Sequence, residues 1–383
     1  MKRKYTFFYG LLRPLVILFA KCKFGYRYRK ATGLPDHYIV LSNHTTDFDL
    51  LFVAASFPRQ MFFVGSEHIA RWKLLYKFLK TCFDPIMRPK GASAASTVKE
   101  MLRRSKNGAN ICLFAEGVRS WDGAPSPIAP STAKMVQRMG CGLVTYRISG
   151  GYFASPMWCG AKSRRGPVYG EPVHIFTAEQ VAAMSTDELH KIIVADLGED
   201  AYERQLADPK PYKSPAPAEG LENLLFICPE CGKRDTFRSE KDTVTCSACG
   251  RSYRYTEYGK LEGAPYETAR QFNLWQLERV DEDVRQNTVY TAGEGALSIV
   301  KDHAEQPVTT GPVALDTAAL RCGELEFPMD TITDLAMHGQ RAIVFTANKV
   351  YYELIIAPGS NAFKFFLYYN ACKALAALPC AVQ

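Results

Sequence analysis

The sequence predicts an α/β domain in the amino-terminal half of the chain, then a small cysteine-bearing unit and a β-rich region closed by a helix. Between residues 37 and 149, short apolar segments alternate with helix-like segments, as in a sheet flanked by helices. Residues 208–219 hold four prolines and no apolar period, which indicates an extended linker. Short alternating segments fill residues 291–356, and the run 361–378 is helical.

The elements of the first domain follow from local patterns. Residues 37–42 are a β-branched segment ending at Asn43, which indicates a buried strand running into a loop. A helix is expected next, because Asp47 and Asp49 place acids ahead of an apolar run. The remaining expected elements are strands at 61–65, 85–88, 109–115 and 142–149 and helices at 69–80, 97–105 and 131–139. In such a sheet, ligand chemistry gathers at the loops beyond the strand ends.

Length and composition limit the class of protein. A chain of 383 residues is expected to form two or three folding units. Hydrophobic residues make up 47% and charged residues 22%, which excludes a mostly disordered chain and a polytopic membrane protein. Eight of the twelve cysteines are scattered singly, which predicts reduced, mostly buried thiols and a reducing compartment. These eight are Cys22, Cys82, Cys112, Cys141, Cys159, Cys322, Cys372 and Cys380.

Positive charge is concentrated at the amino terminus. The formal net charge is +8, and nine basic residues precede the first acid, Asp36, so the rest of the chain is nearly neutral. The apolar run 5–20 is shorter than the ~18–20 residues of a membrane span, and Arg13-Pro14 is expected to break it. Residues 1–35 are therefore expected to be a monotopic anchor on the cytoplasmic face of a membrane containing anionic lipid. The alternative is an amphipathic core helix with a solvated basic flank.

A histidine and a carboxylate five residues apart form the first candidate site. Five residues within one helix would separate their side chains by ~140°. Contact therefore requires His44 to precede the helix and Asp49 to reach back from its first turn. A carboxylate on one ring nitrogen leaves the other free to take a proton from a hydroxyl, which is a general-base arrangement. The alternative is that His44 is a polar loop residue and Asp49 a helix-dipole acid.

Two further segments lie where an α/β site would gather them. Phe114-Ala-Glu-Gly-Val-Arg-Ser directly follows a predicted strand, and Phe83-Asp-Pro-Ile-Met-Arg offers a second arginine beside Lys90. With His44-x4-Asp49, these residues resemble the blocks of the glycerolipid acyltransferases, particularly the 1-acyl-glycerol-3-phosphate acyltransferases, over roughly residues 1–200. The third block departs from the family's Phe-Pro-Glu-Gly-Thr-Arg-Ser at Ala115 and Val118, and the apolar fourth block lacks its usual proline.

The resemblance implies transfer of a fatty acyl group from an acyl thioester, acyl-CoA or acyl-carrier protein, to the hydroxyl of 1-acyl-glycerol-3-phosphate or a related lysophospholipid, without a covalent enzyme intermediate. It implies that His44 is the general base and that Asp49 orients it. The substrate-binding residues that it implies are Arg88, Glu116, Gly117, Arg119 and Ser120. The arginines would hold the acceptor phosphate through bidentate guanidinium contacts.

Four cysteines form two Cys-x2-Cys knuckles separated by 14 residues. Thiolates at this spacing suit a closed tetrahedral Zn²⁺ site with a structural role, similar to a zinc ribbon. The four ligands are expected to be Cys228, Cys231, Cys246 and Cys249. The alternatives are two local disulfides or a redox pair. Basic and acidic residues of the ribbon balance, so no nucleic-acid partner is expected.

The predicted organisation has five parts. They are an anchor at 1–35, an acyltransferase domain at 36–207, a proline-rich linker at 208–220, a zinc ribbon at 221–260 and a module at 285–383 that resembles a pleckstrin-homology domain in its pattern of short strands and one closing helix. For this last module, the alternative is a packing role with no ligand.

Two other classes of function stay open at this point. The chain could be a catalytically idle membrane adaptor that binds lipid and recruits a partner through the ribbon and β module, although four intact motif residues argue against this. It could also use the ribbon to bind nucleic acid, which would require salt-dependent retention of DNA or RNA.

Overall fold

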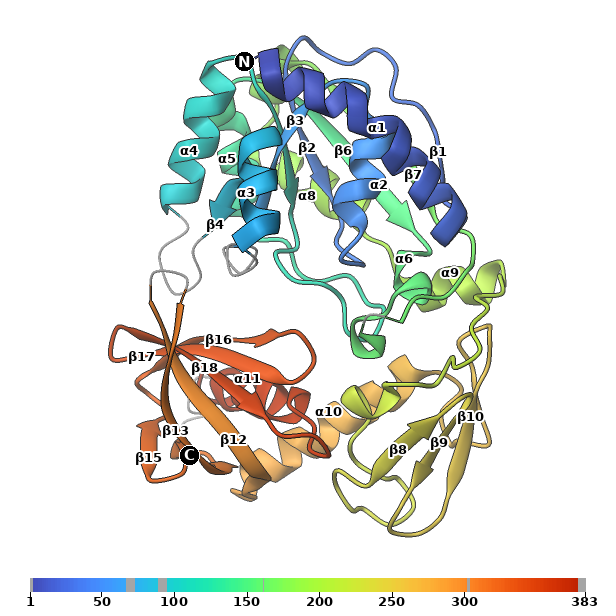
Figure 1. Cartoon of the computed structure of the whole chain (residues 1–383), viewed down its shortest axis with the longest axis vertical. Helices are drawn as coiled ribbons and strands as arrows, with labels where there is room; N and C mark the ends of the chain where they lie inside the picture. The colour runs from blue at the N-terminus through green and yellow to red at the C-terminus, as the bar shows by residue number, and fades with distance from the viewer. Residues whose placement is uncertain (1–2, 67–72, 89–94, 161, 302–303, 378–383) are drawn as a thin grey trace. The chain divides into compact units, whose positions relative to one another are not determined.

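The structure is a computed structural model that describes residues 3–66, 73–88, 95–160, 162–301 and 304–377. These residues form two compact units (Figure 1). Unit 1 holds the described residues up to Met157 and from Lys162 to Ser214. Unit 2 holds Trp158–Gly160 and the described residues from Pro215 onward.

Unit 1 is built on a seven-stranded sheet with the order β1-β7-β6-β2-β5-β3-β4. The strands are β1 (Arg27–Tyr28), β2 (Tyr38–Ser42), β3 (Met61–Ser66), β4 (Ile86–Arg88), β5 (Asn110–Phe114), β6 (Gly142–Ser149) and β7 (Tyr169–Phe176). Strands β6, β2, β5, β3 and β4 are parallel, so their carboxyl ends meet at one edge of the sheet. Strand β7 is antiparallel to β6 and parallel to β1.

Helices cover both faces of this sheet. They are α1 (Arg3–Phe24), α2 (Asp49–Ser56), α3 (Lys73–Cys82), α4 (Ala95–Lys106), α5 (Ser131–Met139), α6 (Gly151–Ala154), α7 (Ala178–Ala183), α8 (Thr186–Leu197) and α9 (Ala201–Ala207). Side chains alternate along β2, so Ile39 and Leu41 join a core cluster with residues of α4, α5 and α8. The opposite face presents Tyr38, whose ring lies 5.9 Å from that of Phe57 at the end of α2.

The predicted alternation of strands and helices is confirmed in unit 1. The strand at 142–149 and the helix at 131–139 have the predicted bounds. Of the predicted helix at 69–80, residues 69–72 lie outside the described residues, and α3 forms from Lys73 onward. The sequence pattern did not indicate β7 or the helices α7 to α9 that follow it.

The prediction that Pro14 breaks the amino-terminal apolar run is wrong. Helix α1 runs through it from Arg3 to Phe24. Tertiary contacts explain this: the Tyr9 hydroxyl donates to the carbonyl of Ala54 at 2.8 Å, and Arg13 Nη2 donates to that of Ala55 at 2.8 Å. These contacts with the end of α2 offset the backbone hydrogen bond that proline removes. No helix among the described residues has the length and apolar character needed to cross a membrane.

Unit 2 contains two antiparallel sheets. A four-stranded sheet comprises β8 (Phe237–Glu240), β9 (Thr243–Cys246), β10 (Ser252–Tyr255) and β11 (Leu261–Glu262). A seven-stranded sheet comprises β12 (Tyr290–Lys301), β13 (Ala304–Leu315), β14 (Ala319–Cys322), β15 (Leu325–Pro328), β16 (Ile332–His338), β17 (Ala342–Ala347) and β18 (Val350–Ile356). Helix α10 (Ala269–Arg285) precedes this sheet and α11 (Phe363–Ala377) closes it; short 3₁₀ helices lie at Met157–Cys159 and Leu221–Asn223. The predicted β-rich region with a closing helix is therefore confirmed.

The single cysteines are free thiols and most are buried, as predicted. Among the described single cysteines, Cys22 is exposed on α1 and Cys372 is only partly buried. Cys380 lies outside the described residues.

Candidate active site

The candidate residues come from loops at the carboxyl edge of the parallel strands. His44 follows β2, Glu116 follows β5, and Arg88 is the last residue of β4. Because these strands are parallel, three segments distant in the sequence reach the same edge of the sheet.

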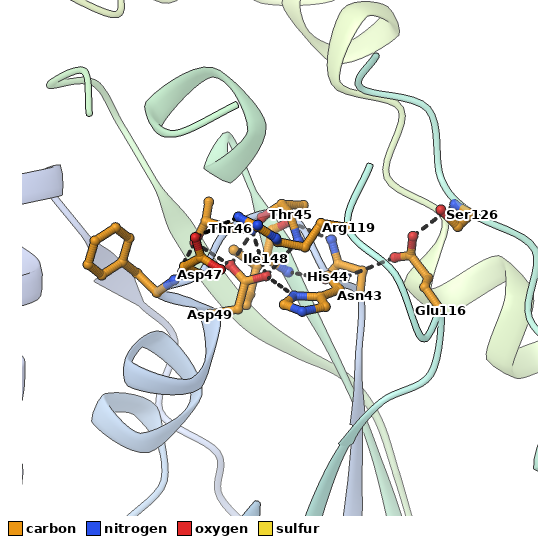
Figure 2. A network of polar contacts seen from close by, with 11 residues as sticks. Asn43, His44, Thr45, Thr46, Asp47, Asp49, Glu116, Arg119, Ser126 and Ile148 are labelled. Carbon is orange, nitrogen blue, oxygen red and sulfur yellow. Dashed lines mark hydrogen bonds and ion pairs between the residues drawn. The ribbon is translucent and has the colours of Figure 1, made fainter. Parts of the chain in front are cut away.

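His44 and Asp49 are in direct contact. Nδ1 of His44 lies 2.9 Å from Oδ2 of Asp49, which is the first residue of α2 and is completely buried (Figure 2). The same carboxylate accepts hydrogen bonds from the backbone N–H groups of Thr45 and Thr46 at 2.5 and 2.9 Å. It also accepts from their hydroxyls at 3.1 and 2.9 Å. The two oxygens of Asp49 therefore have five hydrogen-bonding partners around them.

This arrangement sets the state of the histidine ring. A carboxylate accepts hydrogen bonds, so in the neutral tautomer that fits this contact Nδ1 of His44 carries the proton and Nε2 keeps its lone pair. The ring stacks on Phe114, with centroids 4.5 Å apart and planes at 18°. Packing and the Asp49 contact together fix the orientation of the ring, with Nδ1 toward Asp49 and Nε2 available for a substrate, as a general base requires.

Asn43 anchors the loop that carries His44. Its Nδ2 donates to the carbonyl of Ile148 at 2.8 Å, and its Oδ1 accepts from the N–H of the same residue at 2.8 Å. The side chain thereby continues the pairing of β2 with β6 beyond the last strand residue. Asn43 is buried, so these are the bonds that define where the loop leaves the sheet.

Glu116 lies on the side of His44 away from Asp49 (Figure 2). Its Oε1 accepts from the backbone N–H of His44 at 3.0 Å, and its Oε2 accepts from the N–H of Ser126 at 2.8 Å. Burial raises the pKa of this carboxyl to about 7, although both backbone donors oppose the shift. Glu116 thus connects the loop after β5 to the histidine loop through backbone contacts.

The remaining motif residues occupy the turn after β5. Gly117 has a φ of 73°, which favours glycine, and its N–H donates to the carbonyl of Phe114 at 3.2 Å. A guanidinium nitrogen of Arg88 lies 3.5 Å from the point where a Cβ on Gly117 would stand, so Arg88 reaches this turn. Ser120 is buried; its N–H faces the carbonyl of His44 at 3.4 Å, and its hydroxyl accepts from the N–H of Gly123 at 2.8 Å.

Arg119 forms an ion pair with a residue that the sequence reasoning did not assign to the site. Its Nη1 lies 2.8 Å from Oδ2 of Asp47, in the loop between His44 and Asp49. Arg88 is exposed and forms no ion pair with any described residue. Lys90, the other cation suggested by the sequence, lies outside the described residues.

A small pocket that opens to solvent adjoins these residues, with a cavity volume of about 10 Å³. His44, Glu116 and Ser120 line it, together with Tyr152 and Glu199, which the motifs did not indicate. The arginines were expected to hold the acceptor phosphate, but neither Arg88 nor Arg119 lines this pocket, whose walls carry two carboxyl groups. The charge of Glu199 is compensated by Arg204, whose Nε and Nη2 lie 2.6 and 3.1 Å from its two oxygens.

The second candidate site lies in unit 2, where the four predicted cysteines converge. All their sulfurs lie within 4.8 Å of one another, and the pairs Cys228–Cys249 and Cys231–Cys246 are both 3.8 Å apart. A disulfide would need about 2.05 Å. Tetrahedral coordination with Zn–S bonds of about 2.3 Å places sulfurs about 3.8 Å apart, so the cluster fits a four-thiolate metal site.

Comparisons with known proteins agree with the motif analysis. Residues 26–149, which carry His44 and Glu116, match the family model described as Acyltransferase. A solved structure similar to this chain is the 1-acyl-sn-glycerophosphate acyltransferase PlsC from Thermotoga maritima. It has 16% sequence identity, a TM-score of 0.41 and coverage of 52% of this chain and 81% of that chain. No curated protein matches the chain significantly.

Proposed function

We propose that the chain transfers a fatty acyl group from an acyl thioester, acyl-CoA or acyl-carrier protein, to the hydroxyl of 1-acyl-glycerol-3-phosphate or a related lysophospholipid. The acceptor oxygen forms the new ester bond as the carbon–sulfur bond of the thioester breaks. His44 Nε2 takes the hydroxyl proton, which then passes to the departing thiolate. The contact of His44 Nδ1 with Asp49, at 2.9 Å, is the observation that carries this proposal.

Charge stabilisation supports the same chemistry. The imidazolium that forms on proton transfer lies next to a buried carboxylate, which stabilises it. Arg88 and Arg119 reach the turn after β5 and supply guanidinium groups for the acceptor phosphate. Glu116 and Ser120 contact the backbone of the histidine loop and hold it against that turn.

Replacement of His44 by alanine tests the proposal. We expect His44→Ala to lower the rate of acyl transfer from acyl-CoA to lysophosphatidic acid by about 10²–10⁴-fold, the range for loss of general-base catalysis. His174→Ala is the matched control, because His174 also contacts an aspartate, Asp196, at 2.8 Å but does not line the pocket. Comparable activity in the His44 variant and the wild type would exclude histidine catalysis.

We also propose that α1 lies on a membrane surface, where the acceptor lipid is found. Phe7, Leu11, Leu15 and Leu18 are exposed on this helix at spacings of three or four residues, which places them on one face. Lysines in its last turn suit anionic headgroups. Leu11→Glu with Leu15→Glu should abolish co-sedimentation with vesicles containing phosphatidylglycerol; retained binding would exclude this face as the contact.

The third proposal is that the four cysteines hold a structural Zn²⁺ ion. The sulfur separations match a tetrahedral four-thiolate site, and such a closed site leaves no position open for substrate. Elemental analysis of the purified protein should give one zinc per chain, and a Cys246→Ser variant should lose it. The exposed Cys22→Ser is the control. A metal-free wild type with intact thiols would contradict the assignment.

A further inference from the structure

The guanidinium group suited to an acceptor phosphate already has an anionic partner within the chain. Arg119 Nη1 lies 2.8 Å from Oδ2 of Asp47. The Arg119 side chain is 16% exposed and that of Asp47 is 70% exposed. The cation is thus held in the protein, while its partner sits mostly in water.

Asp47 belongs to the site by position. It lies three residues after His44 and two before Asp49, in the loop that these two residues fix. Figure 2 shows Asp47 and Arg119 beside the Asp49 network. The Asp47 carboxylate does not take part in that network, because the donors to Asp49 come from His44, Thr45 and Thr46.

We propose that Asp47 is a specificity-determining residue that occupies Arg119 until an anionic acceptor displaces it. The inference rests on the proposed function for the identity of the acceptor. Asp47 would weaken the binding of phosphate-bearing acceptors and leave the binding of neutral acceptors unaffected. It therefore reduces the preference of the site for phosphate-bearing acceptors over neutral ones.

A phosphate can displace Asp47 from Arg119, but this displacement lowers the affinity for the phosphate. An ion pair with one partner in water contributes little stability, so Asp47 can turn away from Arg119 into solvent. A phosphate monoester carries more charge than a carboxylate and can contact a guanidinium through two oxygens. The phosphate must nevertheless break the Asp47–Arg119 ion pair before it binds, and the loss of that attraction weakens phosphate binding.

Direct binding of a soluble phosphate probe tests this inference. Glycerol 3-phosphate, with inorganic phosphate as a second probe, is titrated into wild type, Asp47→Asn and Asp47→Ser by calorimetry, after circular dichroism has shown that each variant is folded. Both variants should bind about three- to tenfold more tightly, because the phosphate no longer has to displace a carboxylate from Arg119. Asp187→Asn, which removes an exposed carboxylate from the first turn of α8, should bind as the wild type does.

A double-mutant cycle separates an effect through Arg119 from a general change of charge. In an Arg119→Gln background, Asp47→Asn should change phosphate affinity by less than about twofold. Unchanged or weaker phosphate binding by Asp47→Asn, or no binding by either protein, would overturn the inference. Weaker binding would show instead that Asp47 orients Arg119 for the ligand.

Kinetics distinguish failure of this inference from failure of the proposed function. With lysophosphatidic acid and monoacylglycerol as acceptors, Asp47→Asn should raise the ratio of their kcat/KM values by the same three- to tenfold, through KM for the phosphate-bearing lipid. If wild type acylates neither lipid, the proposed function fails, and the phosphate titration still decides the role of Asp47. If wild type acylates both and the ratio is unchanged, the proposed function stands and the inference fails.

Discussion

Replacing Asp49 by asparagine removes the charge next to His44 while keeping most of the local hydrogen bonds. An amide oxygen at the position of Oδ2 still accepts from His44 Nδ1 and from the backbone N–H groups of Thr45 and Thr46. The two threonine hydroxyls then face the amide nitrogen, which takes the position of Oδ1, and can rotate to accept from its N–H groups. The variant should therefore fold.

The catalytic cost follows from the charge that is lost. With charge centres about 4 Å apart and an effective dielectric constant of about 20, an imidazolium and a carboxylate attract by about 4 kcal/mol. Each 1.36 kcal/mol of barrier is tenfold in rate, so Asp49→Asn should lower kcat by about a thousandfold. Release of free thiol from acyl-CoA in the presence of lysophosphatidic acid measures this rate.

A companion variant checks the structural part of the reasoning. Asp49→Ala leaves five donors without their acceptor and should reduce the free energy of unfolding by about 3–5 kcal/mol, measured in urea. A folded Asp49→Asn protein with kcat within tenfold of wild type would refute the idea that this carboxylate stabilises a cation on His44.

Three further outcomes are expected. Burial raises the pKa of Glu116 from 4.5 to about 7, so the folded chain binds this proton more tightly than the unfolded chain. The free energy of unfolding of the wild type should therefore fall by on the order of 3 kcal/mol as pH rises from 4.5 to 7. Glu116→Gln should remove this pH dependence, measured by urea unfolding. Asn43→Ala should cost about 2–4 kcal/mol of stability by leaving both backbone groups of Ile148 unpaired, whereas Asn43→Asp, which still accepts from the Ile148 N–H, should cost less. Removal of the proposed metal by a chelator should accelerate hydrogen exchange in α11, because buried Lys364 joins α11 to Asp235, four residues beyond Cys231. Unchanged exchange would show that the proposed metal does not stabilise this helix.

The parts of the site that the sequence could predict are those fixed by short segments. His44 and Asp49 meet because a loop residue and a first-turn helix residue five positions apart are neighbours in any strand-loop-helix connection. Glu116 and Arg119 are found in the same way, since they directly follow an apolar strand whose end reaches the site edge. The order of the parallel strands does not alter these local relations.

The parts that could not be predicted depend on tertiary choices between chain segments. Glu199 enters the pocket from the connection between α8 and α9, and no local pattern marks it. Asp47 is an acidic residue that the start of α2 already explains, so nothing in the sequence marks it as part of the site. Its ion pair with Arg119 is visible only in the structure. Pro14 was expected to end a helix, but contacts with α2 override that local preference.

The charge balance of the site gives Arg88 a role that depends on Asp47. Arg119 is compensated by Asp47, whereas Arg88 forms no ion pair with any described residue and lies against Gly117. In wild type, we therefore expect an incoming phosphate to meet Arg88 as a cation without an ion pair among the described residues. Arg88→Gln should then weaken glycerol 3-phosphate binding more in wild type than in Asp47→Asn, where Arg119 is also free to bind. Calorimetry on the wild type, the two single variants and the double variant measures the difference. An equal loss of glycerol 3-phosphate affinity in both backgrounds would show that the two arginines bind phosphate independently of Asp47.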